Sequence, residues 1–366
     1  MRAALCHQSI LFGDAIGHDI FGMRGVLERL GYDVEFIGEF ASEEARTRGR
    51  VIPPAEADMT RYDLVLYHHS ILWREGEELI LNRYAGPTVL RYHNITPAHY
   101  FTPFAAIYVE HCQQGRTQTQ RFAERYPKTL WLADSGFNQD DLVASGVPAQ
   151  HIRVVPPFHQ VNAVSTAQSR TETGAIHGLF VGRYAPNKGH EHLIKVACAA
   201  RKILPVPLHV RMVGTRDAVL QGYLDWLDAL IRELDVSDVV RLDGRLTEAD
   251  LNVAFEEADV FVCMSEHEGF CVPIVEAQAR GLPVVASACA AVVETAGANQ
   301  AILPIPKIPT DYAWYARACL DAVRHQPFRR ALTEAGYRNF YNRFAPDRIE
   351  IAFAEALAPV LQRHLS

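Results

Sequence analysis

The sequence has 366 residues, of which 49% are hydrophobic and 22% charged, a composition typical of a globular protein that can form two domains. Its net charge of −7 argues against a nucleic-acid-binding protein, because no excess of basic residues is present to neutralise phosphates. Seven cysteines without a CxxC pair favour a reducing compartment over a disulfide framework. With no signal-peptide pattern and no apolar run near the roughly 20 residues of a membrane span, we expect a cytoplasmic protein.

The first half begins with a pattern typical of a Rossmann-like domain. Residues 3–6 are predicted to form a strand, residues 19–30 a helix ended by Gly31, and residues 32–37 a second strand. The loop between the first strand and the helix contains Gly13, Asp14 and Ala15 but no G-x-G-x-x-G motif. The missing motif weighs against an NAD-dependent dehydrogenase, and the loop is either an ordinary βα turn or a ligand-binding turn.

Two further strands of the first half end in polar residues. Residues 62–70 and 88–94 each have an apolar strand pattern that leads into histidine, and His93 is at the carboxyl end of the second. Open α/β sheets bind ligands at that edge, although a single histidine is more often a structural residue. A strand at 129–135 follows, and the polar stretch 159–174 is predicted to be a linker.

The second half restarts with a strand that runs into a Gly182-Arg183 turn, and Lys188-Gly189 opens a helix. Two cations five residues apart beside a helix N-terminus are suited to binding an anion, since charges, N–H donors and helix dipole act together. The alternative is a basic surface loop. Strands are predicted at 208–214 and 239–246, and Thr247 is predicted to cap the next helix.

Residues 258–287 are the most informative stretch. An apolar strand leads into a loop with Glu268, then into a helix from Pro273 to Gly281 and a strand at 283–287. Glu276 is expected in the first turn of this helix, where its carboxylate can face the same crevice as that of Glu268. A pair of carboxylates can accept hydrogen bonds from vicinal sugar hydroxyls, although acids also favour helix starts for purely structural reasons.

The segments S-E-H-E-G-F at 265–270, E-A at 276–277, G-L-P-V-V at 281–285 and V-G-R-x-x-x-x-K-G at 181–189 closely resemble motifs of retaining glycosyltransferases of family 4. The resemblance implies an α/β protein of the GT-B fold, with two Rossmann-like domains facing a central cleft. Its expected parts are an acceptor-side domain at 1–160, a linker at 161–175, a donor domain at 176–345 and a C-terminal helix at 346–366 that crosses back to the first domain.

The resemblance also implies roles for individual residues. Glu268 and His93 would contact the transferred hexose, Glu276 the ribose, and Arg183 and Lys188 the diphosphate of a nucleotide-diphosphate sugar. The catalytic candidates are thus Glu268, Arg183, Lys188 and His93. The expected donor-binding residues are Gly13, Asp14, Ala15, Gly182, Arg183, Lys188, Val213, Arg245, Gly269, Phe270, Cys271, Val272 and Glu276.

One position departs from the family pattern. Cys271 stands where the family has glycine, and we expect this change between small residues to be tolerated. Beyond the donor substrate, we expect no cofactor and no metal, because the cations of the protein would stabilise the leaving diphosphate.

The segments Y-H-N-I-T-P at 92–97 and C-V-P-I-V-E at 271–276 resemble those of polysaccharide and O-antigen mannosyltransferases. This resemblance favours GDP-mannose as donor and a glycan or lipid-linked acceptor. Such an acceptor could bring the enzyme to the inner membrane surface, whereas a nucleic-acid partner is not expected. Two alternatives stay open: a GT-B nucleotide-sugar isomerase or epimerase, and a catalytically silent sugar-nucleotide binder. The oligomeric state is left open by the sequence.

Overall fold

A computed structural model describes residues 1–161 and 174–365 of the chain. The chain divides into two compact units. Unit 1 comprises Met1–Ala98, Ile107–Gln160 and Ala345–Ser366, and unit 2 comprises His99–Ala106 and Val161–Phe344. Most of the predicted linker, residues 162–173, lies outside the described residues.

Within the described residues, unit 1 contains a seven-stranded parallel sheet in the order β5-β3-β1-β6-β7-β8-β9. Its strands are β1 (Arg2–Cys6), β3 (Asp33–Ile37), β5 (Val51–Ile52), β6 (Leu64–His69), β7 (Thr88–Tyr92), β8 (Leu130–Ala133) and β9 (Ile152–Val154). A two-residue pair, β2 (Ser9–Ile10) and β4 (Phe40–Ala41), is separate from it. All residues of β6 and β7 are buried, as expected for strands with helices on both faces.

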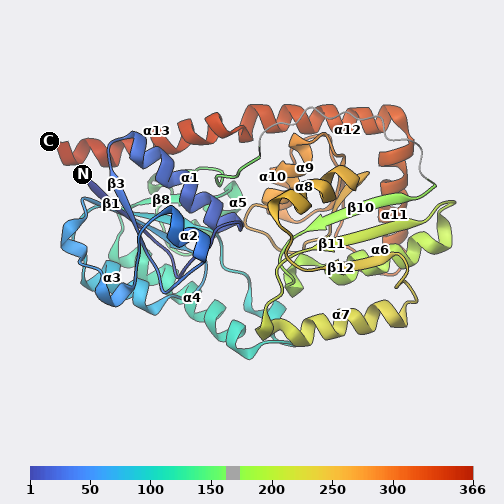
Figure 1. Cartoon of the computed structure of the whole chain (residues 1–366), viewed down its shortest axis with the longest axis horizontal. Coiled ribbons are helices and arrows are strands. Elements are labelled where there is room, and N and C mark those ends of the chain that lie inside the picture. Colours follow the sequence, from blue (N-terminus) through green and yellow to red (C-terminus); the bar gives the residue numbers. More distant parts are fainter. Residues whose placement is uncertain (162–173, 366) are drawn as a thin grey trace. The chain divides into compact units, whose positions relative to one another are not determined.

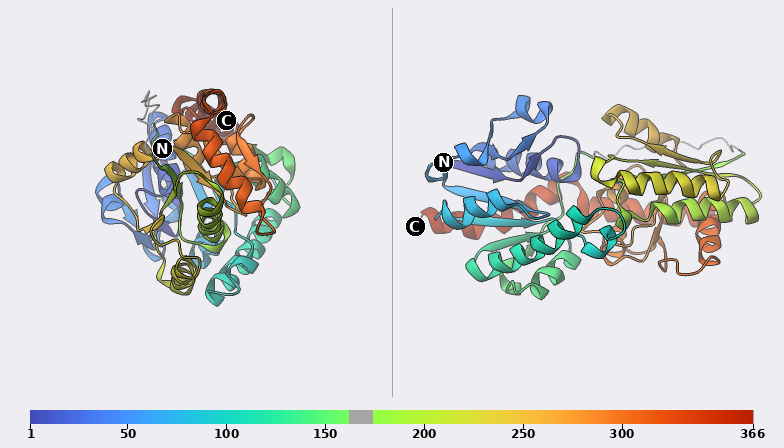
Figure 2. Two further views of the ribbon diagram at one scale, coloured as in Figure 1. Left: turned by 90° about the vertical axis from the view of Figure 1, so that its right-hand side faces the viewer. Right: turned by 90° about the horizontal axis from the view of Figure 1, so that it is seen from below.

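The helices of unit 1 cover both faces of this sheet (Figures 1 and 2). Apolar residues of α1 and α13 pack on one face around Leu5, Phe36 and Leu66, whereas Phe122 of α4 packs against Tyr67 of β6 on the other. The helices are α1 (Ala15–Arg29), α2 (Glu43–Arg48), α3 (Arg74–Asn82), α4 (Ala106–Arg125), α5 (Gly136–Ala144) and α13 (Pro346–Leu365). The fold places the carboxyl ends of β1, β6 and β7 beside one another.

Unit 2 is built in the same way around a six-stranded parallel sheet of described residues, in the order β12-β11-β10-β13-β14-β15. Its strands are β10 (Ile176–Val181), β11 (Leu208–Val213), β12 (Val240–Asp243), β13 (Val260–Cys263), β14 (Val284–Ser287) and β15 (Ala301–Leu303). The order reverses between β10 and β13, which is the switch point where sheets of this kind bind ligands.

Helices again flank this sheet, with α6 and α7 on the side opposite α8 and α9 (Figure 1). The helices of unit 2 are α6 (His190–Ile203), α7 (Gln221–Glu233), α8 (Glu248–Glu257), α9 (Val272–Ala279), α10 (Ala290–Ala296), α11 (Asp311–Arg324) and α12 (Gln326–Asn339). Thr247 caps α8 by accepting from the Asp250 amide, as predicted. Gly281, with φ +69°, follows α9 in the left-handed conformation that the sequence indicated.

Three expectations about the elements were wrong. Helix α1 begins at Ala15 rather than at residue 19, because Asp14 caps it. Residues 99–106 belong to unit 2 and not to the first domain. Glu276 is the fifth residue of α9 and therefore lies in its second turn, because the helix already begins at Val272.

The C-terminal segment from Ala345 belongs to unit 1, one residue before the boundary expected from the sequence, and α13 begins at Pro346. Ile349 and Phe353 of this helix are buried in the core of unit 1. Among the helices within residues 1–161 and 174–365, none is long and apolar enough to span a membrane.

Candidate functional site

The loops at the switch point of unit 2 bring together Lys188 and Glu268. The Lys188 Nζ lies 2.6 Å from Glu268 Oε2, and the Ser265 hydroxyl donates to Glu268 Oε1 at 2.8 Å. The Glu268 side chain is 8% exposed and that of Lys188 is 21% exposed. The two residues are 80 positions apart in the sequence, so the fold pairs the two motifs that sequence analysis identified separately.

The pair determines the charge of the lysine. Burial disfavours the ammonium form of Lys188, but the attraction of the Glu268 carboxylate and its hydrogen bond outweigh this and raise the pKa of the lysine above its ordinary value. Lys188 is therefore a cation at neutral pH, beside the N-terminus of α6. This arrangement can bind an anion.

Close backbone contacts fix the position of this lysine. Gly189 adopts φ +66° as the N-cap of α6, and an added Cβ there would lie 2.1 Å from the Met264 carbonyl oxygen. The Asn187 carbonyl accepts from the Glu266 amide at 3.0 Å, and its side chain donates to the His267 carbonyl at 2.9 Å. Asn187 thus ties the loop before α6 to the loop that carries Glu268, a positioning role that sequence analysis missed.

The other predicted donor residues of unit 2 occupy several different environments. Arg183 and Arg245 are exposed, whereas Val213 is 3% exposed and its carbonyl accepts from the Gly182 amide at 2.9 Å. The side chain of Val213 is thus part of the core and does not form a polar contact. Glu276 is partly exposed on α9, and burial, only partly offset by Arg280, raises the pKa of its carboxyl.

The segment between Glu268 and α9 is largely buried. Gly269 links Glu268 to Phe270, whose ring packs edge-on against Phe344 with centroids 5.4 Å apart. Val272 is the first residue of α9. Cys271, its N-cap, adopts φ 82° and ψ 67°, a conformation that glycine adopts without strain and cysteine does not. The substitution of cysteine for glycine therefore adds backbone strain at the start of α9.

In unit 1, the predicted ligand-binding turn forms a helix cap. The Asp14 carboxylate accepts from the Gly17 amide at 2.6 Å, and Ala15 is the first residue of α1. Gly13, Asp14 and Ala15 are all exposed. The structural role of Asp14 is therefore established, and binding by this turn stays a proposal.

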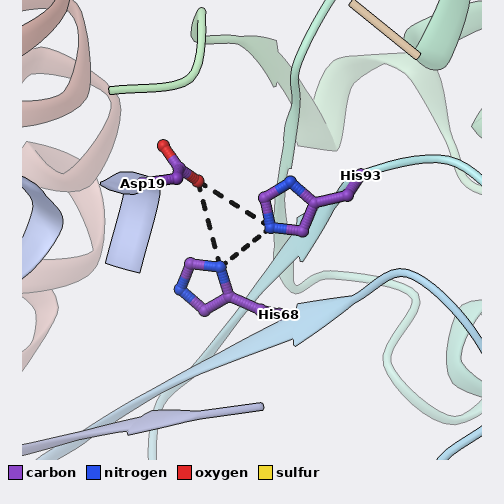
Figure 3. A group of neighbouring side chains, drawn as sticks. All are labelled: Asp19, His68 and His93. Atoms are coloured by element: carbon purple, nitrogen blue, oxygen red, sulfur yellow. Dashed lines mark hydrogen bonds and ion pairs between the residues drawn. The ribbon is translucent and has the colours of Figure 1, made fainter. Parts of the chain in front are cut away.

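His93 directly follows β7 and belongs to a buried polar cluster, part of which Figure 3 shows. Its Nδ1 lies 3.0 Å from Asp134 Oδ2 and its Nε2 lies 2.9 Å from His68 Nδ1. Asp19 Oδ2 lies 3.8 Å from His93 Nε2 and 3.9 Å from His68 Nδ1. Because Asp134 accepts from Nδ1–H, the proton of a neutral His93 is held at Nδ1.

Arg91 balances the two carboxylates of this cluster. Its guanidinium donates to Asp19 at 2.8 Å and 3.2 Å and to the Val155 carbonyl at 2.7 Å, and it lies 2.8 Å from Asp134 Oδ1. Burial nevertheless raises the pKa of Asp19, with Arg91 opposing the shift. Burial and the neighbouring His93 hold the pKa of His68 well below its usual range, so His68 is neutral.

Sequence analysis missed Asp19, His68, Arg91 and Asp134 as members of this cluster. A signal for two of them was present, since His68 and Arg91 interrupt apolar strands that are buried throughout. Unit 1 also has a cavity of about 440 Å³ beside α1 and α13, lined by Phe12, Phe21 and Arg48 among others. None of the predicted site residues lines that cavity.

Comparison with protein families identifies the second half of the chain. A family described as "Glycosyl transferases group 1" matches residues 165–339. These residues form a group 1 glycosyltransferase domain. The glycosyltransferase domain contains the Lys188–Glu268 pair and every candidate residue of unit 2.

The similarity to curated relatives extends beyond the glycosyltransferase domain. D-inositol 3-phosphate glycosyltransferase of Thermomonospora curvata is 28% identical over 319 residues, which cover 82% of this chain and 72% of that protein. The enzyme of the same name from Kineococcus radiotolerans is 29% identical over 67% of this chain and 58% of its own length. Mannosylfructose-phosphate synthase of Agrobacterium fabrum is 29% identical over 38% of this chain and 33% of its own. The chain thus spans only part of the length of these relatives.

Solved structures share the fold of the whole chain. Anabaena Alr3699/HepE in complex with UDP and glucose has a TM-score of 0.74 at 20% identity and covers 98% of this chain and 100% of its own. Sucrose-phosphate synthase of Thermosynechococcus elongatus also has a TM-score of 0.74, at 18% identity, covering 99% of this chain and 100% of its own. These similarities and the two parallel sheets confirm the GT-B fold with two Rossmann-like domains.

Proposed function

We propose that this protein is a retaining glycosyltransferase that transfers mannose from GDP-mannose to a glycan or lipid-linked acceptor in polysaccharide or lipopolysaccharide synthesis. The observation that carries the proposal is the buried Lys188–Glu268 pair at the switch point of the glycosyltransferase domain. A cation and a carboxylate placed together at such an edge can bind the diphosphate and the sugar hydroxyls of one donor.

In the proposed reaction, Lys188 and Arg183 stabilise the charge that develops on the leaving diphosphate. The bond between the sugar C1 and the phosphate oxygen breaks, and a bond from C1 to the acceptor oxygen forms on the same face. The acceptor proton passes to the leaving phosphate oxygen. This step needs neither a metal nor a protein nucleophile.

The sugar and the ribose have carboxylate partners in this proposal. Glu268 accepts from hexose hydroxyls when the donor phosphate takes over as the partner of Lys188, and the partly exposed Glu276 accepts from the ribose hydroxyls. His93, held as a single tautomer by Asp134, is proposed to contact the hexose. The family resemblance supports these roles, and the measurements below test them.

The donor assignment rests on relatives. A mannosylfructose-phosphate synthase and an MMP alpha-(1->4)-mannosyltransferase are among them, and their names favour mannose. A second candidate donor is a UDP-hexose, because the solved structure of Anabaena Alr3699/HepE contains UDP and glucose. An acceptor bearing a sugar or inositol phosphate is a further candidate, since the names of several relatives specify one.

Thermal-shift titration with GDP, UDP, ADP, dTDP and their sugar conjugates tests the donor site. A nucleotide that binds only the native state at 100 times its Kd adds about 2.7 kcal/mol to the free energy of unfolding, so its class is identified by a rise in Tm. We expect GDP-mannose to raise the Tm of the wild type, and Glu276→Ala to abolish the rise. Glu256→Ala, an exposed acid on α8, is the matched control. A rise with UDP-sugars alone would replace GDP-mannose by the second candidate, and no rise with any nucleotide would refute the donor site.

The charge role of Lys188 is tested by Lys188→Met. We expect kcat to fall by about 10²–10³, the loss typical of removing one group that stabilises developing negative charge. The control variant Lys195→Met, which removes a lysine within α6, should keep the kcat of the wild type. NMR of the product then tests retention, since an inverted anomeric centre or a new sugar nucleotide without transfer would contradict the proposed reaction.

A further inference from the structure

Two cysteines lie next to Glu268, and one of them is Cys271, at the position where the family resemblance implies glycine. Cys263 ends β13 and Cys271 caps α9, and their sulfur atoms lie 3.9 Å apart. Both are buried, with exposures of 0% for Cys263 and 8% for Cys271. The loop between them carries Glu268, so the two thiols stand at the two ends of the segment that carries this carboxylate.

The geometry of this group matches a thiolate–metal site. One ligand atom each of Cys263, Glu268 and Cys271 lies within 4.8 Å of the others. A tetrahedral zinc ion with bonds of about 2.3 Å to two thiolates places the sulfur atoms about 3.8 Å apart. The observed separation of 3.9 Å therefore closely matches the separation that such an ion requires.

The charges of the site also fit a divalent cation. With both thiols protonated, Glu268 and Lys188 form a neutral pair. A divalent cation that displaces both thiol protons adds two positive and two negative charges, so the buried group stays neutral. The displaced protons pass to solvent. A buried site that keeps its net charge avoids the large cost of an unpaired buried ion.

Among the residues that the structure describes, two other clusters of potential ligands fit less well. In the group of Asp19, His68 and His93, Arg91 already pairs with the carboxylates of Asp19 and Asp134, so an added divalent cation would leave a buried positive charge. The group of Glu191, His192 and Glu266 contains no sulfur, and two of its members are partly exposed. Sulfur ligands select soft metals, so the group of Cys263, Glu268 and Cys271 differs from the other two groups in the metals that it favours.

We propose that Cys263, Cys271 and Glu268 form a binding site for one thiophilic divalent cation of the Zn²⁺ or Cd²⁺ class, and that the bound cation inhibits sugar transfer by occupying Glu268. Binding of the cation stands on the geometry alone. Only the inhibition rests on the function proposed above. The glycine that the family resemblance implies at 271 would supply no ligand, so the proposed site depends on Cys271.

Titration of the reduced, metal-free protein with Cd²⁺ tests the binding. We expect thiolate-to-cadmium charge-transfer absorption in the ultraviolet that saturates at one Cd²⁺ per chain. In Cys263→Ala, and separately in Cys271→Gly, we expect the absorption to be lost or the affinity for Cd²⁺ to fall. Removing a residue that only supports a metal ligand already lowers metal affinity about tenfold to a hundredfold, so the loss of a ligand itself should lower it at least as much. Cys319→Ala, which removes another buried cysteine, should bind as the wild type does. Equal titration curves for the wild type, Cys263→Ala and Cys271→Gly would overturn the site.

Inhibition is measured separately on the initial rate of transfer. Cd²⁺ and Zn²⁺ should inhibit the wild type, and Cys263→Ala should keep its basal rate while resisting both ions. Stoichiometric binding with an unchanged rate would overturn the proposed inhibition. If the protein transfers no sugar but the absorption appears and depends on both cysteines, the cation site stands and the proposed function fails.

Discussion

Replacing Arg91 by methionine tests how the buried cluster of unit 1 is held together. The guanidinium is fully buried and contacts two carboxylates, those of Asp19 and Asp134, as well as the Val155 carbonyl. Methionine keeps most of the apolar volume but leaves both carboxylates without their cation. The substitution therefore isolates the charge from the packing.

The expected loss is large. Breaking a buried ion pair by removing one partner costs about 3–5 kcal/mol, because the other charge stays buried and uncompensated. Two carboxylates lose their cation here. The Phe158 amide still donates to Asp19, and His93 still bonds to Asp134. We expect a loss of about 4 kcal/mol in the free energy of opening of unit 1 at pH 7. Arg29→Met, which removes an exposed pair with Glu350, should cost about 0.5 kcal/mol.

Hydrogen exchange measured by mass spectrometry is the suitable assay, because peptides from β7 and β8 report on unit 1 alone. The loss should also depend on pH. Burial already raises the pKa of Asp19, and removal of Arg91 raises it further, so the native variant binds more protons than its unfolded chain. Its stability therefore falls as pH rises above the unfolded carboxyl pKa of about 3.9, and its deficit is larger at pH 8 than at pH 5. A deficit below about 1 kcal/mol, or one equal at both pH values, would refute this account of the cluster.

Substitutions at three further positions, with their controls, test local features. In urea unfolding, Gly189→Ala should destabilise unit 2 by about 2–4 kcal/mol, because alanine is strained at the left-handed φ and its Cβ would clash with the Met264 carbonyl. The control Gly222→Ala lies in open space on α7 and should instead stabilise unit 2 by about 0.5–1 kcal/mol. Equal effects of the two substitutions would contradict the role of the backbone at 189. Cys271→Gly should be more stable than Cys271→Ala by about 1 kcal/mol, because both lack the thiol and only alanine is strained at φ 82°; the reverse order would exclude strain. Asp14→Ala should cost about 1 kcal/mol as the loss of a helix cap, and no loss of stability would contradict the cap; a raised donor KM would in addition support binding by this turn.

Local patterns in the sequence determined the architecture of each unit. Buried parallel strands appear as continuous apolar runs, and the caps and stops at Thr247, Gly189 and Gly281 depend on residues only a few positions away. Two helix starts were predicted wrongly. Asp14 caps α1, so this helix begins at Ala15 rather than at residue 19. Cys271 is the N-cap of α9, so this helix begins at Val272, and Glu276 therefore lies in its second turn.

Only the tertiary structure determined which side chains meet. Asp19 and Arg91 are 72 residues apart, and Lys188 and Glu268 are 80 apart, and no local periodicity encodes such pairs. The inclusion of residues 99–106 in unit 2 was likewise decided by the tertiary structure. The sequence supplied the residue types and placed them at strand and helix ends. The parallel sheet brought those ends to one edge, and burial there decided which charges had to be paired.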